Sequence, residues 1–138
     1  MTDHARTPRI LVVEDNADIV DIVQRRLRLD GMEPVVCTSG SAAKALLDQD
    51  TFDAVLLDIM MPDVDGYEVL RHIRASPAMD ELPVIMLTSK ARRDDVEKGH
   101  AMGANAYIIK PFGPFDLVRT LRACLGKRSG APSTPAAS

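Results

Sequence analysis

Short apolar runs divide the chain into regular units. Continuous runs of strand length occupy residues 10–13, 54–57, 84–87 and 106–109, and a weaker run occupies residues 34–37. None of these runs alternates polar with apolar positions. Such continuity is typical of strands that are buried on both faces of a sheet. The runs therefore predict a parallel sheet with helices covering both of its sides.

A segment with helical spacing of apolar residues follows each run. Asn16 and Asp18 supply capping or first-turn chemistry for the first of these helices, and Gly31 is expected to end it. A fourth, more polar helix is expected to have few apolar anchors. The residues that mark the five helices are Ile19, Val23 and Leu27; Ala42–Leu47 behind Ser39 or Ser41; Tyr67–Arg74; about Ala91–Met102; and the inward stripe Phe115, Val118, Leu121 and Leu125.

Five strand–helix units in strict alternation define the fold class. The pattern predicts an α/β domain with a doubly wound, five-stranded parallel sheet, because right-handed crossovers leave helices on both faces. The domain is expected to span residues 9–125. Residues 1–8 are expected to form a flexible N-terminal segment. Residues 126–138, which are polar and rich in proline, are expected to be a disordered tail or the start of a linker.

Polar side chains follow the predicted strands at the points where they end. Because parallel strands share one carboxyl edge, these groups should gather where open α/β sheets bind their ligands. Any one of them could instead cap a helix or lie in solvent. Together, three carboxylates would repel one another unless a divalent cation and a lysine balance them, and oxygen ligands with open positions suit Mg²⁺. The residues in question are Glu14, Asp15, Asp58, Thr88, Ser89 and Lys110.

Composition removes several classes of function. The chain has 138 residues, 46% of them apolar, and its net charge of −3 argues against direct nucleic-acid binding. Its glycines are scattered and form neither a P-loop nor a GxGxxG turn. No histidine follows a strand, so a Ser–His–Asp arrangement is excluded as well. What remains is a carboxylate nucleophile with a metal and a cationic clamp, which suits phosphoryl transfer to aspartate.

The two cysteines and the N-terminus indicate a cytoplasmic protein. Cys37 and Cys124 are far apart and lack metal-ligand spacing, so buried free thiols are favoured over a zinc site or a disulfide. The N-terminal residues contain no apolar segment of a secretory signal. No stretch has the roughly 20 apolar residues that a membrane span needs, so no membrane association is expected.

Three motifs together resemble one known family. They are the segment Asp58–Gly66, the segment Val13–Asn16 and the segment Lys110–Phe112, with Thr88 and Gly103–Ala104 at matching places. On these motifs, Arg9 to Leu125 resembles the receiver domain of two-component response regulators. The resemblance implies a flavodoxin-like (βα)5 fold with strand order 2-1-3-4-5 and a cis peptide before Pro111.

The resemblance also implies a role for each polar residue. Asp58 would accept a phosphoryl group from the phosphohistidine of a sensor histidine kinase or phosphotransfer protein. Asp15, Asp58 and the main-chain carbonyl of Met60 would bind Mg²⁺, and Glu14 would support the metal through water. Lys110 would pair first with Asp58 and then with a phosphoryl oxygen. Such a domain is not a conventional enzyme, although it assists its own phosphorylation and dephosphorylation.

Switching would follow from the same resemblance. Thr88 would move toward the phosphoryl group, and Tyr107 would turn into the space that Thr88 leaves. The surface of the fourth helix, fifth strand and fifth helix would then change for a downstream protein or a missing output domain. Ser89, where the family usually has alanine, departs from the pattern, while Met60 and Lys90 occupy positions that vary within the family.

Two other functions are compatible with parts of the pattern. A receiver-like module could bind partners without being phosphorylated, although such modules usually lack a pocket residue and this chain lacks none. A hydrolase of the haloacid-dehalogenase type would need a second acidic residue two positions after Asp58, where this chain has Met60. The tail leaves open whether the chain acts alone or comes from a longer regulator.

Overall fold

A computed structural model describes residues 7–61, 63–89 and 93–128 of the chain. Its sheet has five strands in the order β2-β1-β3-β4-β5, and every pair of neighbours is parallel. This arrangement confirms the expected fold class and the strand order that the resemblance implied. The strands are β1 (Arg9–Val13), β2 (Glu33–Cys37), β3 (Ala54–Asp58), β4 (Val84–Thr88) and β5 (Ala106–Ile109).

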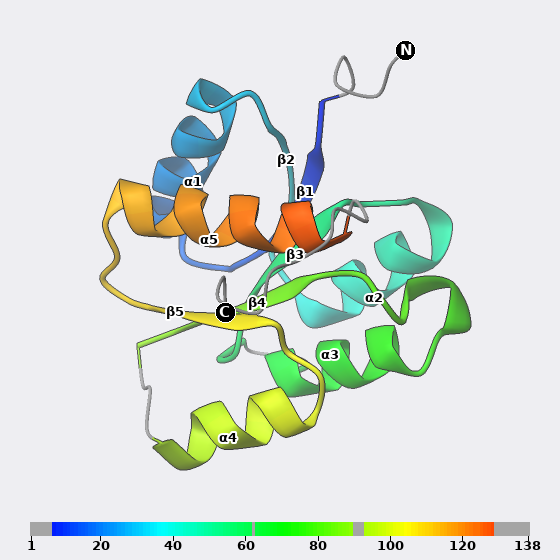
Figure 1. The fold of residues 1–138 in the computed structure, drawn as a ribbon. Helices are drawn as coiled ribbons and strands as arrows, with labels where there is room; N and C mark the ends of the chain where they lie inside the picture. Colours follow the sequence, from blue (N-terminus) through cyan, green and yellow to red (C-terminus); the bar gives the residue numbers. More distant parts are fainter. Residues whose placement is uncertain (1–6, 62, 90–92, 129–138) are drawn as a thin grey trace.

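Helices cover both faces of the sheet (Figure 1). Helices α1 and α5 lie together on one face, and α2, α3 and α4 lie on the other. A short 3₁₀ helix follows α3. The bounds are α1 (Ala17–Leu29), α2 (Gly40–Gln49), α3 (Gly66–Arg74), η2 (Pro77–Met79), α4 (Arg93–Ala101) and α5 (Pro114–Arg128). Residues 91–92, which belonged to the expected fourth helix, lie outside the described residues.

The core consists of two layers because successive side chains of a strand point to opposite faces. In β1, Ile10 and Val12 belong to the layer under α1 and α5, whereas Leu11 and Val13 belong to the layer under α2 and α3. The central strands β3 and β4 are buried throughout. Their continuous apolar runs reflect this double burial, as expected.

Polar side chains set where the first helices begin. The Asn16 side chain accepts hydrogen bonds from the backbone N–H groups of Asp18 and Ile19 at 2.9 and 3.1 Å. Ser39, one of the two candidates for α2, accepts a bond from Ala42. These bonds satisfy N–H groups that have no acceptor inside the helix. After α1, Gly31 adopts a φ of 79°, the left-handed conformation expected at a helix end.

The expected inward stripe of α5 was partly wrong. Its buried residues are Leu117, Leu121 and Cys124, while Phe115 is 77% exposed. Phe115 precedes Leu121 by six positions, which turns its side chain about 120° away from the core-facing direction. Helix α5 also continues to Arg128, three residues past the expected end of the domain. Residues 1–6 and 129–138, which make up most of the two segments expected to be flexible or disordered, lie outside the described residues.

The edge position of β5 likewise exposes an apolar residue that was expected to be buried. Its apolar run suggested burial on both faces, yet Ile109 is 53% exposed. An edge strand has a neighbour on one side only, and its composition does not reveal this position. The other outer strand, β2, is only partly buried, in agreement with its weaker run.

The structure also bears on the two cysteines and on membrane-spanning helices. Cys37 and Cys124 are both buried and form no disulfide, as favoured. No helix within the described ranges has the length and apolar character needed to cross a lipid bilayer.

The stripe on α5 gives a stability test. Leu121→Ala should lower the free energy of unfolding by about 3 kcal/mol, because it leaves a cavity in a fully buried site. Phe115→Ala removes a larger side chain from an exposed position and should cost much less. Urea denaturation of both variants beside the parent chain measures the difference. Equal losses in the two variants would contradict the observed orientation of α5.

Candidate functional site

The register of the strands brings the expected polar residues to one edge. Val13 pairs with Leu57, so the residues that follow them on neighbouring strands, Glu14 and Asp58, lie side by side. Thr88 ends β4 and pairs with Ile109, and the next residue after Ile109 is Lys110. One edge of the sheet therefore holds the groups that the sequence placed after separate strands.

Lys110 forms the electrostatic centre of this edge. Its Nζ lies 2.8 Å from Oε1 of Glu14 and 3.5 Å from Oδ1 of Asp58. The expectation that Lys110 pairs with Asp58 is thus met only by the longer contact, because the shorter one goes to Glu14. Glu14 is fully buried and Asp58 is 4% exposed. Without Lys110, both carboxylates would lie in the protein interior without a positively charged partner, which costs free energy.

Three carboxylates converge closely enough to share a cation. Ligand oxygens of Glu14, Asp15 and Asp58 lie within 4.8 Å of one another. Glu14 and Asp58 form the buried floor, and Asp15 is exposed toward solvent. Oε1 of Glu14 is buried and accepts no hydrogen bond of good geometry from the described residues, despite its ion pair with Lys110. These hard oxygen donors and the open side fit Mg²⁺, which keeps several waters when bound.

The surroundings of Asp58 disfavour its negative charge. Burial, and then the charge of Glu14, raise the pKa of Asp58 from its ordinary 3.8 to about 6. Lys110 opposes the rise through its positive charge. The backbone N–H of Met60 also opposes it, by donating to Oδ1 at 3.2 Å. At neutral pH the group is therefore a carboxylate held in unfavourable surroundings, which a bound cation would relieve.

Of the two residues expected to switch, Thr88 ends β4 at this edge and Tyr107 lies within β5, paired with Met86. Thr88 is buried, and Tyr107 is half-buried in β5. The Tyr107 hydroxyl lies over Gly99 of α4, in the space that an added Cβ would occupy. The ring of His100 lies 5.4 Å from that of Tyr107. Sequence reasoning counted Gly99 only as a scattered glycine, because its contact depends on how α4 is placed over β5.

The structure also bears on the cis peptide and on Ser89. The Lys110–Pro111 peptide bond is cis, as the resemblance implied. Ser89 is exposed directly after Thr88. Lys90 lies outside the described residues.

A residue of the loop after Asp58 has an unexpected contact. The Asp63 carboxylate accepts hydrogen bonds from the backbone N–H groups of Gly40 and Ser41, each at 3.1 Å. Asp63 and Gly40 are 23 positions apart in the sequence. A pattern of local spacing could not have indicated this contact, which joins the loop to the start of α2.

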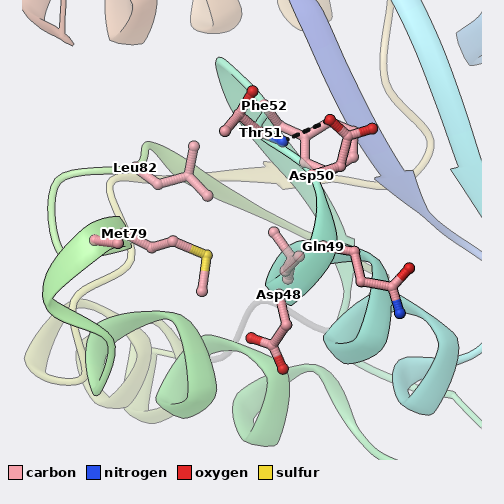
Figure 2. Close-up of a pocket in the computed structure, with 9 residues that line it drawn as sticks. Asp48, Gln49, Asp50, Thr51, Phe52, Met79 and Leu82 are labelled. Carbon is pink, nitrogen blue, oxygen red and sulfur yellow. Dashed lines mark hydrogen bonds between the residues drawn. The ribbon is translucent and has the colours of Figure 1, made fainter.

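A hollow of about 230 Å³ lies between the end of α2 and the segment that precedes β4 (Figure 2). Met79 and Leu82 line one side of it. The nearby acids are engaged elsewhere: Asp48 contacts His72 at 2.9 Å, and Asp50 pairs with Arg9 at 3.0 Å. The hollow therefore offers no cluster of open ligands comparable to the sheet edge.

Comparison with known proteins identifies the family. Residues 10–122 match the response regulator receiver domain, and the chain therefore belongs to that family. Transcriptional regulatory protein PrrA of Mycobacterium tuberculosis is 36% identical over 128 residues, covering 93% of this chain and 54% of PrrA. The chain thus spans about half the length of this curated relative.

Two solved structures show the same fold. The receiver domain of the sensor histidine kinase PA1611 from Pseudomonas aeruginosa, with a magnesium ion coordinated in its active site cleft, is 33% identical. The alignment covers 87% of this chain and 98% of that one, with a TM-score of 0.81. Chemotaxis response regulator CheY4 of Vibrio cholerae is 29% identical over 86% of this chain and 98% of its own, also with a TM-score of 0.81.

The raised pKa of Asp58 predicts a pH-dependent stability in metal-free buffer. Above about pH 6 the folded protein holds an unfavourable carboxylate, so Asp58→Asn should be more stable than the parent chain. As pH falls from about 6 to 3.8, Asp58 takes up a proton in the folded state first, and the advantage of the variant should disappear. Urea denaturation in EDTA across this range measures the difference.

Asp50→Asn is a matched control with the opposite sign. The hydrogen bond from Arg9 holds the pKa of Asp50 below its ordinary value. This stabilisation is present above the unfolded pKa and is lost in acid, so Asp50→Asn should be less stable only at higher pH. A pH-independent difference between Asp58→Asn and the parent chain would contradict the electrostatic account of Asp58.

Proposed function

We propose that this receiver domain accepts a phosphoryl group on Asp58 from a phosphohistidine of a sensor histidine kinase or phosphotransfer protein. The observation that carries the proposal is the position of Asp58, a buried carboxylate within 3.5 Å of the Lys110 ammonium. Its pKa of about 6 leaves it mostly ionised, and thus nucleophilic, at neutral pH. The comparisons establish the family, and the phosphoryl chemistry of this chain is our inference from the site.

Transfer of the phosphoryl group to Asp58 needs no reactant other than the phosphohistidine donor. A carboxylate oxygen of Asp58 attacks the phosphorus of the phosphohistidine, and a P–O bond forms as the P–N bond breaks. The imidazole nitrogen of the donor leaves with the electron pair. The product is an acyl phosphate on Asp58, and hydrolysis of that bond by water returns the carboxylate and inorganic phosphate. The domain thus assists its own phosphorylation and dephosphorylation without turning over a separate substrate.

The neighbours of Asp58 have distinct proposed roles. Asp15, Asp58 and the main-chain carbonyl of Met60 would hold Mg²⁺, with Glu14 supporting it through water. The bound ion would supply positive charge beside the phosphoryl oxygens. The magnesium ion in the related PA1611 receiver supports this assignment.

Lys110 and Thr88 would act on the phosphoryl group itself. Lys110 already lies between Glu14 and Asp58, so a small movement would bring its ammonium to a phosphoryl oxygen. The Thr88 hydroxyl would donate to another oxygen. As Thr88 moved inward, Tyr107 would follow, which would alter its contact with Gly99 and therefore the α4–β5–α5 surface.

That surface would carry the signal to a protein partner. PrrA is a transcriptional regulator about twice as long as its match to this chain. Residues 9–125 would accordingly form the receiver unit of a cytoplasmic pathway. Its target would be either an output domain of a longer regulator or a separate protein, with no direct contact to nucleic acid.

Phosphorylation of the purified chain tests the proposal. With Mg²⁺ and radiolabelled acetyl phosphate or a phosphorylated histidine kinase, the parent chain should acquire one acid-stable, base-labile label. Asp58→Asn should acquire none, because the amide is not a nucleophile. Asp50→Asn, which changes an acid at the opposite edge of the sheet, should label like the parent chain.

Three outcomes would contradict the proposal. Label that persists in Asp58→Asn would show that another residue is the acceptor. A folded parent chain that takes no label from either donor would favour a non-phosphorylated interaction module. Continuous release of phosphate from small esters at many turnovers would favour a hydrolase.

A further inference from the structure

The loop between β3 and α3, described at residues 59–61 and 63–65, carries Met60, whose carbonyl is a proposed metal ligand. Its two ends are well fixed. Next to β3, the N–H of Met60 donates to Oδ1 of Asp58, and next to α3 the N–H of Gly66 donates to the carbonyl of Ile59 at 2.9 Å. Gly66 also lies so close to Asp58 that an added Cβ would be 2.5 Å from its carbonyl oxygen.

Asp63 joins the middle of the loop to α2. Its two carboxylate oxygens accept from different backbone groups, Oδ1 from Gly40 and Oδ2 from Ser41, at 3.1 Å each. These are the first two residues of α2, and their N–H groups have no acceptor within the helix. Ser39 satisfies the next N–H, that of Ala42. The start of α2 thus depends on one side chain of its own and one from the loop.

The contact is charged as well as hydrogen-bonded. The Ser41 hydroxyl, followed by the backbone N–H groups of Val64, Ser41 and Gly40, holds the pKa of Asp63 well below its usual range. Asp63 therefore stays ionised at neutral pH. Its negative charge lies at the positive end of the α2 dipole, which favours the same arrangement.

Gly40 makes the approach possible. A Cβ on this residue would be 2.6 Å from the carbonyl oxygen of Val64 and 2.8 Å from its Cβ. The backbone of the loop therefore lies directly against the first turn of α2, with no room for a side chain between them. Helix α2 is anchored in turn through Ala43 and Leu47, which are buried in the core layer below it.

We infer that Asp63 is a positioning residue for the metal site, because its bond to α2 fixes the loop that presents the Met60 carbonyl. This inference rests on the proposed function. Asp63 itself would not touch the metal or the phosphoryl group. Its effect would reach the metal through the position of the Met60 carbonyl, so removing Asp63 should weaken Mg²⁺ binding without removing any ligand.

The test is a titration of the full chain with Mg²⁺. Binding is monitored by calorimetry and by the NMR signals of the backbone amides of Asp58 and Met60. The parent chain should bind Mg²⁺. Asp63→Ala should bind it about tenfold more weakly, the low end of what loss of an outer-shell partner costs. Asp63→Asn keeps an acceptor oxygen but no charge, and its affinity should fall between the two.

Ser39→Ala is the matched control. It removes the other cap of α2, at the same helix end, but leaves the loop contact intact. It should lower the unfolding free energy, as Asp63→Ala does, and leave Mg²⁺ affinity unchanged. Gly40→Ala is an independent variant that keeps Asp63 and pushes the loop from α2; it should weaken Mg²⁺ binding as well.

The outcomes separate this inference from the proposed function. If the folded parent chain binds no Mg²⁺, the proposed function fails first. If the parent chain binds Mg²⁺ and both folded Asp63 variants bind it equally well, Asp63 is only a helix cap and the inference is overturned. Equal weakening in Ser39→Ala and Asp63→Ala would overturn it too, since loss of either cap would then suffice.

Discussion

The burial of Glu14 beside Asp58 is the constraint on which the rest of the site depends. Parallel pairing of β1 with β3 places the two acids on adjacent strands, and both are almost completely shielded from water. Two neighbouring carboxylates in such a place require positive charge. Lys110 supplies part of it, and its Nζ lies closer to the fully buried Glu14 than to Asp58. Burial of Asp58, and then the charge of Glu14, raise its pKa more than Lys110 lowers it, and a bound cation would relieve the same unfavourable charge.

The sequence predicted the sheet and its reactive edge well because both depend on local composition. A strand buried on both faces is apolar along its whole length, and polar residues directly after such strands gather at one edge of a parallel sheet. Strand order came from the family resemblance, since no local pattern encodes it. The exposure of Phe115 and Ile109 was missed for a related reason: an apolar residue reveals a preference for burial, but only the packed neighbours decide whether a surface exists to cover it.

Contacts between distant segments were beyond sequence reasoning for a different reason. Asp63 looks like any polar loop residue, and Gly40 looks like a weak first residue of a helix. Only when α2 and the β3–α3 loop are side by side does the carboxylate meet two unpaired N–H groups, and only then does the missing side chain at Gly40 become necessary. Each feature is unremarkable alone, and the pairing that explains both is a property of the fold.

Gly99 extends this reasoning to the opposite flank of the site. A glycine within a helix costs about 1 kcal/mol relative to alanine, and α4 is already polar. The position of Tyr107 explains the choice, because its hydroxyl occupies the space where a Cβ of residue 99 would be. Lys98 lies 4.5 Å above the ring of Tyr67, so a second tyrosine, from α3, also contacts α4. Helix α4 is thus held partly by aromatic side chains of neighbouring elements, and a rotation of Tyr107 would change the surface under the helix. Under the proposed switching, the position of the Tyr107 hydroxyl over Gly99 is therefore the contact through which a change near Asp58 would reach α4.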